Sequence, residues 1–272
     1  MIPGLSIFMM FFGLLFSIAF PVALFIVIKK KYKTGIAPFF IGCAVWFGFA
    51  MILEQIMHSV ILNSSSIGGT ITGNIYLYAL YGGLAAGLFE ETGRFVAMKF
   101  WLKKYYANPY NSIMYGAGHG GIEVLLILGV ANINNIIYSV LYNAGLSNIL
   151  LDPLPAESKE IVMNSFELLK TTSPLAFLAG DFERIVAVIL HISLSVLVWM
   201  SVVYGKRILF PLAIFLHFLM DASSVLVNEW TGSIVIVEVV IAVISLGCAF
   251  FAYYLWKGKI TPILLDESSQ NE

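Results

Sequence analysis

Long apolar stretches alternate along the chain with short polar connections. In a helix, crossing a bilayer takes about 20 predominantly apolar residues. Stretches of that length cover residues 4–28, 35–62, 74–100, 111–132, 174–203, 208–227 and 232–256. Such unbroken runs favour helices over the alternating ten-residue strands of a membrane barrel. We therefore predict an all-α, polytopic integral membrane helix bundle with about seven transmembrane helices, forming a single membrane domain over residues 1–272.

The composition agrees with a membrane protein. Hydrophobic residues make up 60% of the 272 and charged residues 11%, with a mean hydropathy of +0.91. A soluble domain has about 45–50% apolar and about 25% charged residues, so lipid must solvate the outside here. The net charge of −1 argues against a nucleic-acid partner. We expect the lipid bilayer as a partner, a multi-pass place in the cell membrane, and Cys43 and Cys248 as small buried hydrophobes.

The basic residues predict the orientation. If the N-terminus lies outside, Lys159 and Lys170 fall in outer connections, and Arg94 and Arg184 fall within spans. The other basic residues all fall in inner connections: Lys29, Lys30, Lys31, Lys33, Lys99, Lys103, Lys104, Lys206, Arg207, Lys257 and Lys259. Inner connections of membrane proteins carry an excess of Lys and Arg. We therefore place the N-terminus outside and the C-terminus in the cytoplasm, with residues 260–272 as a short cytoplasmic tail.

One connection is longer and more polar than the rest. Residues 143–173 form an extracytoplasmic loop in this topology, and Pro153 and Pro155 interrupt it. Apolar residues then recur at roughly helical spacing, at Ile161, Val162, Phe166, Leu168 and Leu169. This pattern predicts an amphipathic helix at the outer interface, as a plain surface helix or as a cap over a cavity.

Ionisable residues inside the spans are the candidates for chemistry. They are costly in hydrocarbon, so they normally face the interior of the bundle. The set contains all four histidines: Glu54, His58, Glu90, Glu91, Arg94, His119, Glu123, Glu183, Arg184, His191, His217, Asp221, Glu229 and Glu238. At about 1.5 Å per residue, one layer near the midplane holds Glu90, Glu91, His119, His191 and His217. A second layer, nearer the outside, holds Glu54, His58, Glu183 and Arg184.

Spacing within each helix predicts which side chains meet. Residues three or four apart share a helical face, which places His119 beside Glu123 and His217 beside Asp221. A carboxylate behind an imidazole is typical of metal-bound histidines. Pairing of Glu54 with His58, and of Glu183 with Arg184, would fix helix register. Glycines near the candidates, Gly82, Gly83, Gly87, Gly116, Gly118, Gly120 and Gly121, predict that the third and fourth spans press together.

Three motifs resemble those of a known superfamily. They are Glu90-Glu91-Thr92-Gly93-Arg94, Tyr115-x-x-x-His119 and His217-x-x-x-Asp221. They resemble the EExxxR, FxxxH and HxxxN or HxxxD motifs of the CAAX-protease and bacteriocin-processing superfamily, and those of the related PrsW proteases. In detail, with Glu183-Arg184 followed by His191, the chain most resembles the bacterial YhfC family of intramembrane metalloproteases. The first motif is one residue shorter than the prenyl-protease pattern, and Tyr115 replaces phenylalanine.

The resemblance implies an enzyme of the bacterial plasma membrane, an intramembrane endopeptidase that hydrolyses a peptide bond in a membrane-associated peptide or protein. Glu90 would be the base, and Arg94 would pair with Glu91, although which glutamate faces the water stays open. His119 and His217 would bind a divalent metal, zinc by preference, or donate to the oxyanion. His191 would be a third imidazole and Glu123 a ligand or a partner of His119. Asp221 would orient His217.

Other functions remain open on the sequence alone. Midplane carboxylates and histidines also relay protons in transporters, although the chain shows no internal repeat. A noncatalytic immunity or scaffold protein could retain the fold. Glu90, Glu91 and Arg94 would then form a structural ion-pair cluster, and the histidines would hydrogen-bond between helices.

Overall fold

The structure is a computed structural model that describes the backbone of residues 1–64 and 66–269, and side chains up to residue 258. Every regular element in these ranges is helical. Helical segments long and apolar enough to cross a membrane are Gly4–Tyr32, Ala37–Leu62, Asn111–Asn143, Pro174–Val203, Leu209–Thr231 and Ile234–Gly258. The predicted all-α membrane bundle is confirmed.

The elements follow one another with short connections. The first half of the chain contains α1 (Gly4–Tyr32), α2 (Ala37–Trp46), η1 (Phe47–Glu54), α3 (Gln55–Leu62), α4 (Ile67–Thr72), α5 (Ile75–Val96), η2 (Ala97–Trp101) and η3 (Lys103–Tyr105). The second half contains α6 (Asn111–Glu123), η4 (Val124–Gly129), α7 (Val130–Asn143), α8 (Asn148–Leu151), α9 (Ala156–Thr171), α10 (Pro174–Val203), α11 (Leu209–Thr231) and α12 (Ile234–Ser269). Segments η1, η2 and η4 are π-helical and continue their neighbours.

The helix α5 takes the place of the third predicted span. It is 22 residues long and packs along α11. It is more polar than the six apolar segments because Glu90, Glu91 and Arg94 lie on it. The total of seven spans therefore stays a prediction, as does the orientation in the membrane.

Local sequence sets several helix ends. The side chain of Asn74 accepts hydrogen bonds from the backbone N–H groups of Tyr76 and Leu77 at the start of α5. Ser173 caps α10, which begins at a proline. Gly232 has a φ of 59°, a left-handed conformation that suits glycine, and it ends α11.

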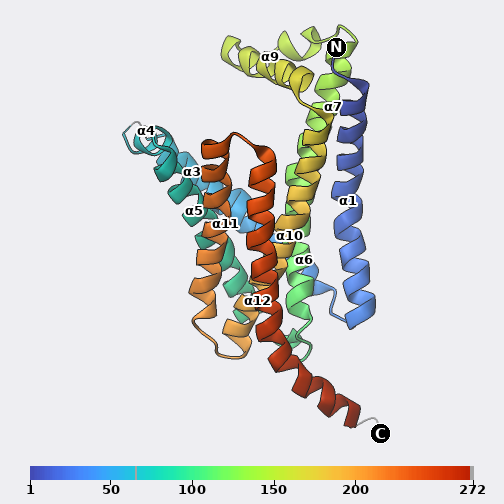
Figure 1. The fold of residues 1–272 in the computed structure, drawn as a ribbon, viewed down its shortest axis with the longest axis vertical. Coiled ribbons are helices and arrows are strands. Elements are labelled where there is room, and N and C mark those ends of the chain that lie inside the picture. The colour runs from blue at the N-terminus through green and yellow to red at the C-terminus, as the bar shows by residue number, and fades with distance from the viewer. Residues whose placement is uncertain (65, 270–272) are drawn as a thin grey trace.

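The helix α10 lies at the centre of the bundle (Figure 1). Of its apolar window, 72% is buried inside the protein, against 22% to 33% for the other five segments. It packs against α6 and α1 on one side and against α12 and α11 on the other. The N-terminus and α9 lie at one end of the bundle, and α1 and α10 finish at the opposite end. Asn108, after η3, donates to the backbone carbonyl of Tyr32, which joins two basic connections at that opposite end.

The polar connection between α7 and α10 contains α9. Its buried residues Val162, Phe166 and Leu169 form its inner face, and Leu169 packs with Ile2 and Met10 of the N-terminal region. The placement of residues 143–173 outside the membrane stays a prediction. The predicted tail, 260–272, overlaps the end of α12, and its residues 270–272 lie outside the described part of the chain.

The glycines of α5 and α6 do not pack these two helices against each other, as the sequence predicted, but against other helices. A Cβ on Gly83 would lie 2.8 Å from the carbonyl oxygen of Phe218, so the α5 glycines accommodate α11. A Cβ on Gly116 would lie 2.6 Å from Cα of Ile192, and one on Gly118 only 1.9 Å from the carbonyl oxygen of Phe39. The α6 glycines therefore accommodate α10 and α2. The prediction that they press the third span against the fourth is wrong, because these small faces point to different neighbours.

The close approach at Gly118 should be sensitive to a single methyl group. We expect Gly118→Ala to lower the free energy of unfolding by about 1–3 kcal/mol, since the backbone of α2 must move. Gly82 is the control, because a Cβ at this position would have nothing within 4 Å. Gly82→Ala should not lower the free energy of unfolding. Thermal unfolding of both variants in detergent measures this, and equal melting temperatures would contradict the packing.

Candidate active site

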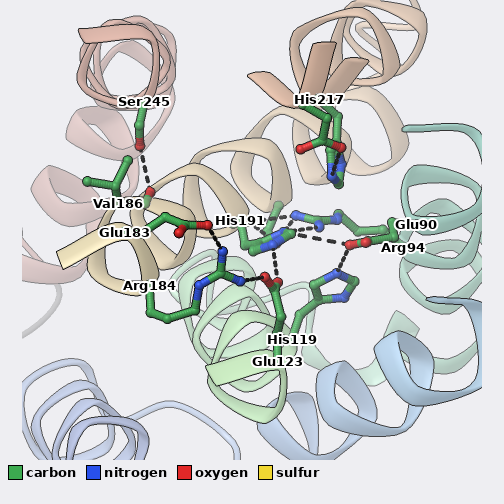
Figure 2. Close-up of polar contacts among 12 residues, drawn as sticks. Glu90, Arg94, His119, Glu123, Glu183, Arg184, Val186, His191, His217 and Ser245 are labelled. Carbon is green, nitrogen blue, oxygen red and sulfur yellow. Dashed lines mark hydrogen bonds and ion pairs between the residues drawn. The ribbon is translucent and has the colours of Figure 1, made fainter. Parts of the chain in front are cut away.

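Four helices bring ionisable residues together at one place in the bundle (Figure 2). The residues by helix are Glu90, Glu91 and Arg94 on α5, His119 and Glu123 on α6, Arg184 and His191 on α10, and His217 and Asp221 on α11. Most are buried, and Glu91, Arg94 and His119 are 0% exposed. Glu90, His119, His191 and His217 therefore meet, as helix counting predicted, whereas Arg184, which the counting put in the outer layer, adjoins the same cluster.

A carboxylate and two imidazoles form the centre of the site. Glu90 Oε2 lies 2.8 Å from His119 Nε2 and 3.9 Å from His191 Nδ1. The rings of His119 and His191 have centroids 4.9 Å apart. Each of the three residues offers a ligand atom within 4.8 Å of the others, the one such group of three metal-binding side chains in the described residues.

A second carboxylate stands behind His191. Glu123 Oε2 lies 2.5 Å from His191 Nε2, and Arg184 Nη1 donates to Glu123 Oε1 at 2.6 Å. Arg184 also pairs with its neighbour Glu183, as the sequence predicted. Glu123 contacts the imidazole of α10, whereas the sequence placed it beside His119. The physical reason is that α10 packs against α6 and brings His191 to Glu123, while His119 contacts Glu90 of α5.

Glu91 and Arg94 form a buried pair that joins three helices. Arg94 Nε lies 3.2 Å from Glu91 Oε2, as the sequence predicted. Glu91 Oε1 lies 2.9 Å from His217 Nδ1. Arg94 Nη1 donates to the backbone carbonyl of His191 at 2.5 Å and to Ser195 Oγ at 2.8 Å. Ser195 carries no sequence signal, because serine is common in membrane helices.

The outer layer contains the other predicted pair. His58 Nε2 lies 3.2 Å from Glu54 Oε1. His58 Nδ1 lies 2.7 Å from the hydroxyl of Tyr81, which sequence reasoning missed because an aromatic residue in a span normally indicates packing. His217 Nε2 lies 3.6 Å from Asp221 Oδ2, one helical turn away.

A polar cavity of about 110 Å³ adjoins this cluster. Glu90, Glu123, His191 and His217 line it and are each less than a tenth exposed. A cavity of this size and polarity can hold a few water molecules. A larger cavity of about 360 Å³ lies between α1, α2 and α6 with its continuation η4. Its walls are almost wholly apolar, so the smaller, polar cavity is the candidate active site.

The residues at the centre fit a divalent metal. One carboxylate with two imidazoles is a donor set found in zinc peptidases, which keep a further position open for water. Glu123 stands behind His191 as an orienting carboxylate does at such sites. His119 Nδ1 is fully buried and has no hydrogen-bond partner among the described residues. Of the four ligands expected from sequence, His119 and His191 lie in the group, and Glu90 completes it in place of His217 and Glu123.

Comparison with known proteins shows which family the chain belongs to. A family model described as "YhfC intramembrane metalloprotease" matches residues 16–244. The chain belongs to the YhfC family. It is 32% identical over 251 residues to "Uncharacterized membrane protein YhfC" of Bacillus subtilis (strain 168), an alignment that covers 92% of this chain and 95% of that protein. No solved structure matches the chain. Membership confirms the resemblance drawn from the three motifs and the multi-pass membrane location.

The buried Glu91–Arg94 pair gives a stability prediction for this YhfC protein. Removing one partner of a buried ion pair leaves the other charge uncompensated and costs about 3–5 kcal/mol. We expect Glu91→Ala to destabilise the fold by that amount, measured by thermal or denaturant unfolding in detergent. Glu229, exposed near the end of the same helix as His217, provides the control, and Glu229→Ala should change stability by less than about 0.5 kcal/mol. If Glu91→Ala lost as little stability as Glu229→Ala, Arg94 would not be a buried charge that depends on Glu91.

Proposed function

We propose that this protein is a metal-dependent intramembrane endopeptidase that hydrolyses a peptide bond in a membrane-associated peptide or protein. The observation that carries the proposal is the group of Glu90, His119 and His191 beside a polar cavity inside an apolar bundle. Family membership supports it. Ionisable residues at this depth are expensive in a membrane, and they normally mark a functional site.

Glu90, His119 and His191 would hold the divalent ion, with zinc the metal that their donor types favour. A bound ion supplies a Lewis acid for the peptide carbonyl and for the attacking water. Both ring nitrogens of His191 have partners, Arg94 at Nδ1 and Glu123 at Nε2. Ligation by His191 therefore replaces one of these two contacts.

Glu90 is the glutamate that acts on water in this proposal. Its carboxylate lines the cavity. Oε2, which contacts His119, would be the ligand atom, which leaves Oε1 to accept a proton from a water molecule in the cavity. Glu91 is 0% exposed, with one oxygen on His217 and the other on Arg94. We therefore assign the base to Glu90 and a positioning role to the Glu91–Arg94 pair.

His217 carries the proton to the leaving group in the same scheme. Glu91 holds its Nδ1, so that Nε2 is the nitrogen left for the cavity that the ring lines. Water oxygen bonds to the carbonyl carbon, Glu90 takes the water proton, the C–N bond breaks, and His217 protonates the departing amine. Asp221, 3.6 Å from Nε2, stabilises the charged ring. His119 would serve as a ligand.

Metal content is the first test. We expect purified protein to retain about one equivalent of zinc per chain, as a single catalytic site requires. His119→Ala and His191→Ala should each lose most of that metal, measured by elemental analysis after gel filtration. His58→Ala is the matched control, because His58 contacts Glu54 and Tyr81 away from the group. Retention of full metal by His119→Ala and His191→Ala would remove these ligands from the proposal.

Cleavage is the second test, on a panel of model transmembrane and peptide substrates. We expect wild-type protein to cleave at least one substrate and Glu90→Gln to lower kcat by about 10²–10⁴-fold, the usual loss for a general base. Glu167→Gln, on the exposed face of α9, should cleave at the wild-type rate. Undiminished cleavage by Glu90→Gln that keeps its fold would show a contaminating protease or a different base.

A further inference from the structure

The polar cavity is also lined by two carboxylates at its more exposed end, of which the reaction scheme uses only Asp221. Glu183 on α10 and Asp221 on α11 line the cavity, and their side chains are 41% and 40% exposed. The four inner lining residues, Glu90, Glu123, His191 and His217, are each less than a tenth exposed. Accessibility therefore rises towards Glu183 and Asp221, and these two residues mark the opening.

A third carboxylate, Glu238, lies on α12 one helical turn from the cavity. Glu238 lies three residues before Ile241, which lines the cavity, so the two share a helical face. Glu238 is only 8% exposed, and its Oε2 has no hydrogen-bond partner in the described part of the chain. An unpaired buried carboxylate is unfavourable at this depth unless a cation or donor pairs with it.

The opening has more negative than positive charge. Arg184 is the one lysine or arginine among the residues that line the described cavity. Its guanidinium already pairs with Glu123 and Glu183. Asp221 has the His217 imidazole 3.6 Å away, and Glu238 Oε2 has no hydrogen-bond partner among the described residues. A ligand that suits this opening therefore has positive charge.

The spread of the carboxylates favours an organic cation over a metal ion. Within the described chain, ligand atoms that gather within 4.8 Å belong to Glu90, His119 and His191, and the three carboxylates of the opening form no such group. They come from three different helices. A lysine ammonium or an arginine guanidinium has several donors on a flexible stem and can reach carboxylates that one ion cannot bridge.

We propose that Glu183, Asp221 and Glu238 form an acidic mouth that binds a basic side chain of the substrate, a lysine or arginine within a few residues of the bond that is cut. This inference rests on the proposed endopeptidase function and adds a substrate class to it. The mouth lies along the part of α10 that precedes His191 and the part of α11 that follows His217. Both parts lead towards the end of the bundle that holds the N-terminus. A basic residue held there would fix the position of the peptide over Glu90.

The test uses pairs of membrane peptides that differ only by lysine or glutamine, scanned over the positions next to the scissile bond. We expect wild type to prefer the best lysine peptide by about tenfold or more in kcat/KM, the effect of one charge-assisted hydrogen bond. Glu238→Gln and Glu183→Gln should each bring this ratio close to one. Glu229→Gln, the same substitution at an exposed position outside the cavity lining, should keep the wild-type ratio.

Binding of the same peptides, labelled with a fluorophore and followed by anisotropy, separates this inference from the cleavage proposal. If wild type cleaves nothing but binds the lysine peptide more tightly, and Glu238→Gln loses that preference, the mouth stands while the endopeptidase proposal fails. Equal or absent binding of both peptides overturns the mouth, even if cleavage occurs. Thermal stabilisation by Mg²⁺ or Ca²⁺ that Glu238→Gln abolishes, without a lysine preference, would assign the mouth to an inorganic cation and also overturn it.

Discussion

The guanidinium of Arg94 holds together three of the helices that build the site. It is completely buried, and a charge in so apolar a bundle is tolerated only when its donors are satisfied. Glu91 on the same helix supplies the counter-charge, while α10 supplies the carbonyl of His191 and the hydroxyl of Ser195. Glu91 in turn holds His217 of α11. The relative positions of α5, α10 and α11, and therefore of two histidines, depend on this one cation.

The positions of the site helices also depend on close helix packing around α6 and α5. The α6 glycines let α10 and α2 approach its backbone, and the α5 glycines let α11 approach α5. Small residues allow such contacts in a membrane, where there is no hydrophobic effect between helices to drive association. The consequence is chemical as well as structural, because His119, His191 and Glu90 come from α6, α10 and α5 and meet only at this spacing.

The polar residues of the site are graded from sealed to accessible. Glu91 and Arg94 are fully buried and serve to hold the others. Glu90, His191 and His217 line a small cavity, which a hydrolytic site needs so that water can enter a protein surrounded by lipid. Glu183 and Asp221 lie where the cavity opens. The gradient leads from the buried ion pair, through a cavity that can hold water, to the more exposed carboxylates.

The sequence by itself determined the helical membrane fold, the family and the set of ionisable residues that carry the site. It also predicted the pairs within one helix, Glu91 with Arg94 and Glu54 with His58, because residues three or four apart must share a face. Helix counting placed His119, His191 and His217 at one depth because the rise per residue of a helix is fixed.

Only the tertiary structure decided which residues meet between helices. The spans are apolar on nearly all sides, so the sequence pattern does not fix how each helix is rotated or which neighbour its glycines face. That rotation joins Glu90 to His119 and Glu123 to His191, and it places Ser195 on Arg94 and Tyr81 on His58. The π-helical segments after Trp46, Val96 and Glu123 rotate the chain that follows each of them, and no sequence pattern predicted these segments. Contacts between helices depend on these angles, and the packed bundle alone sets them.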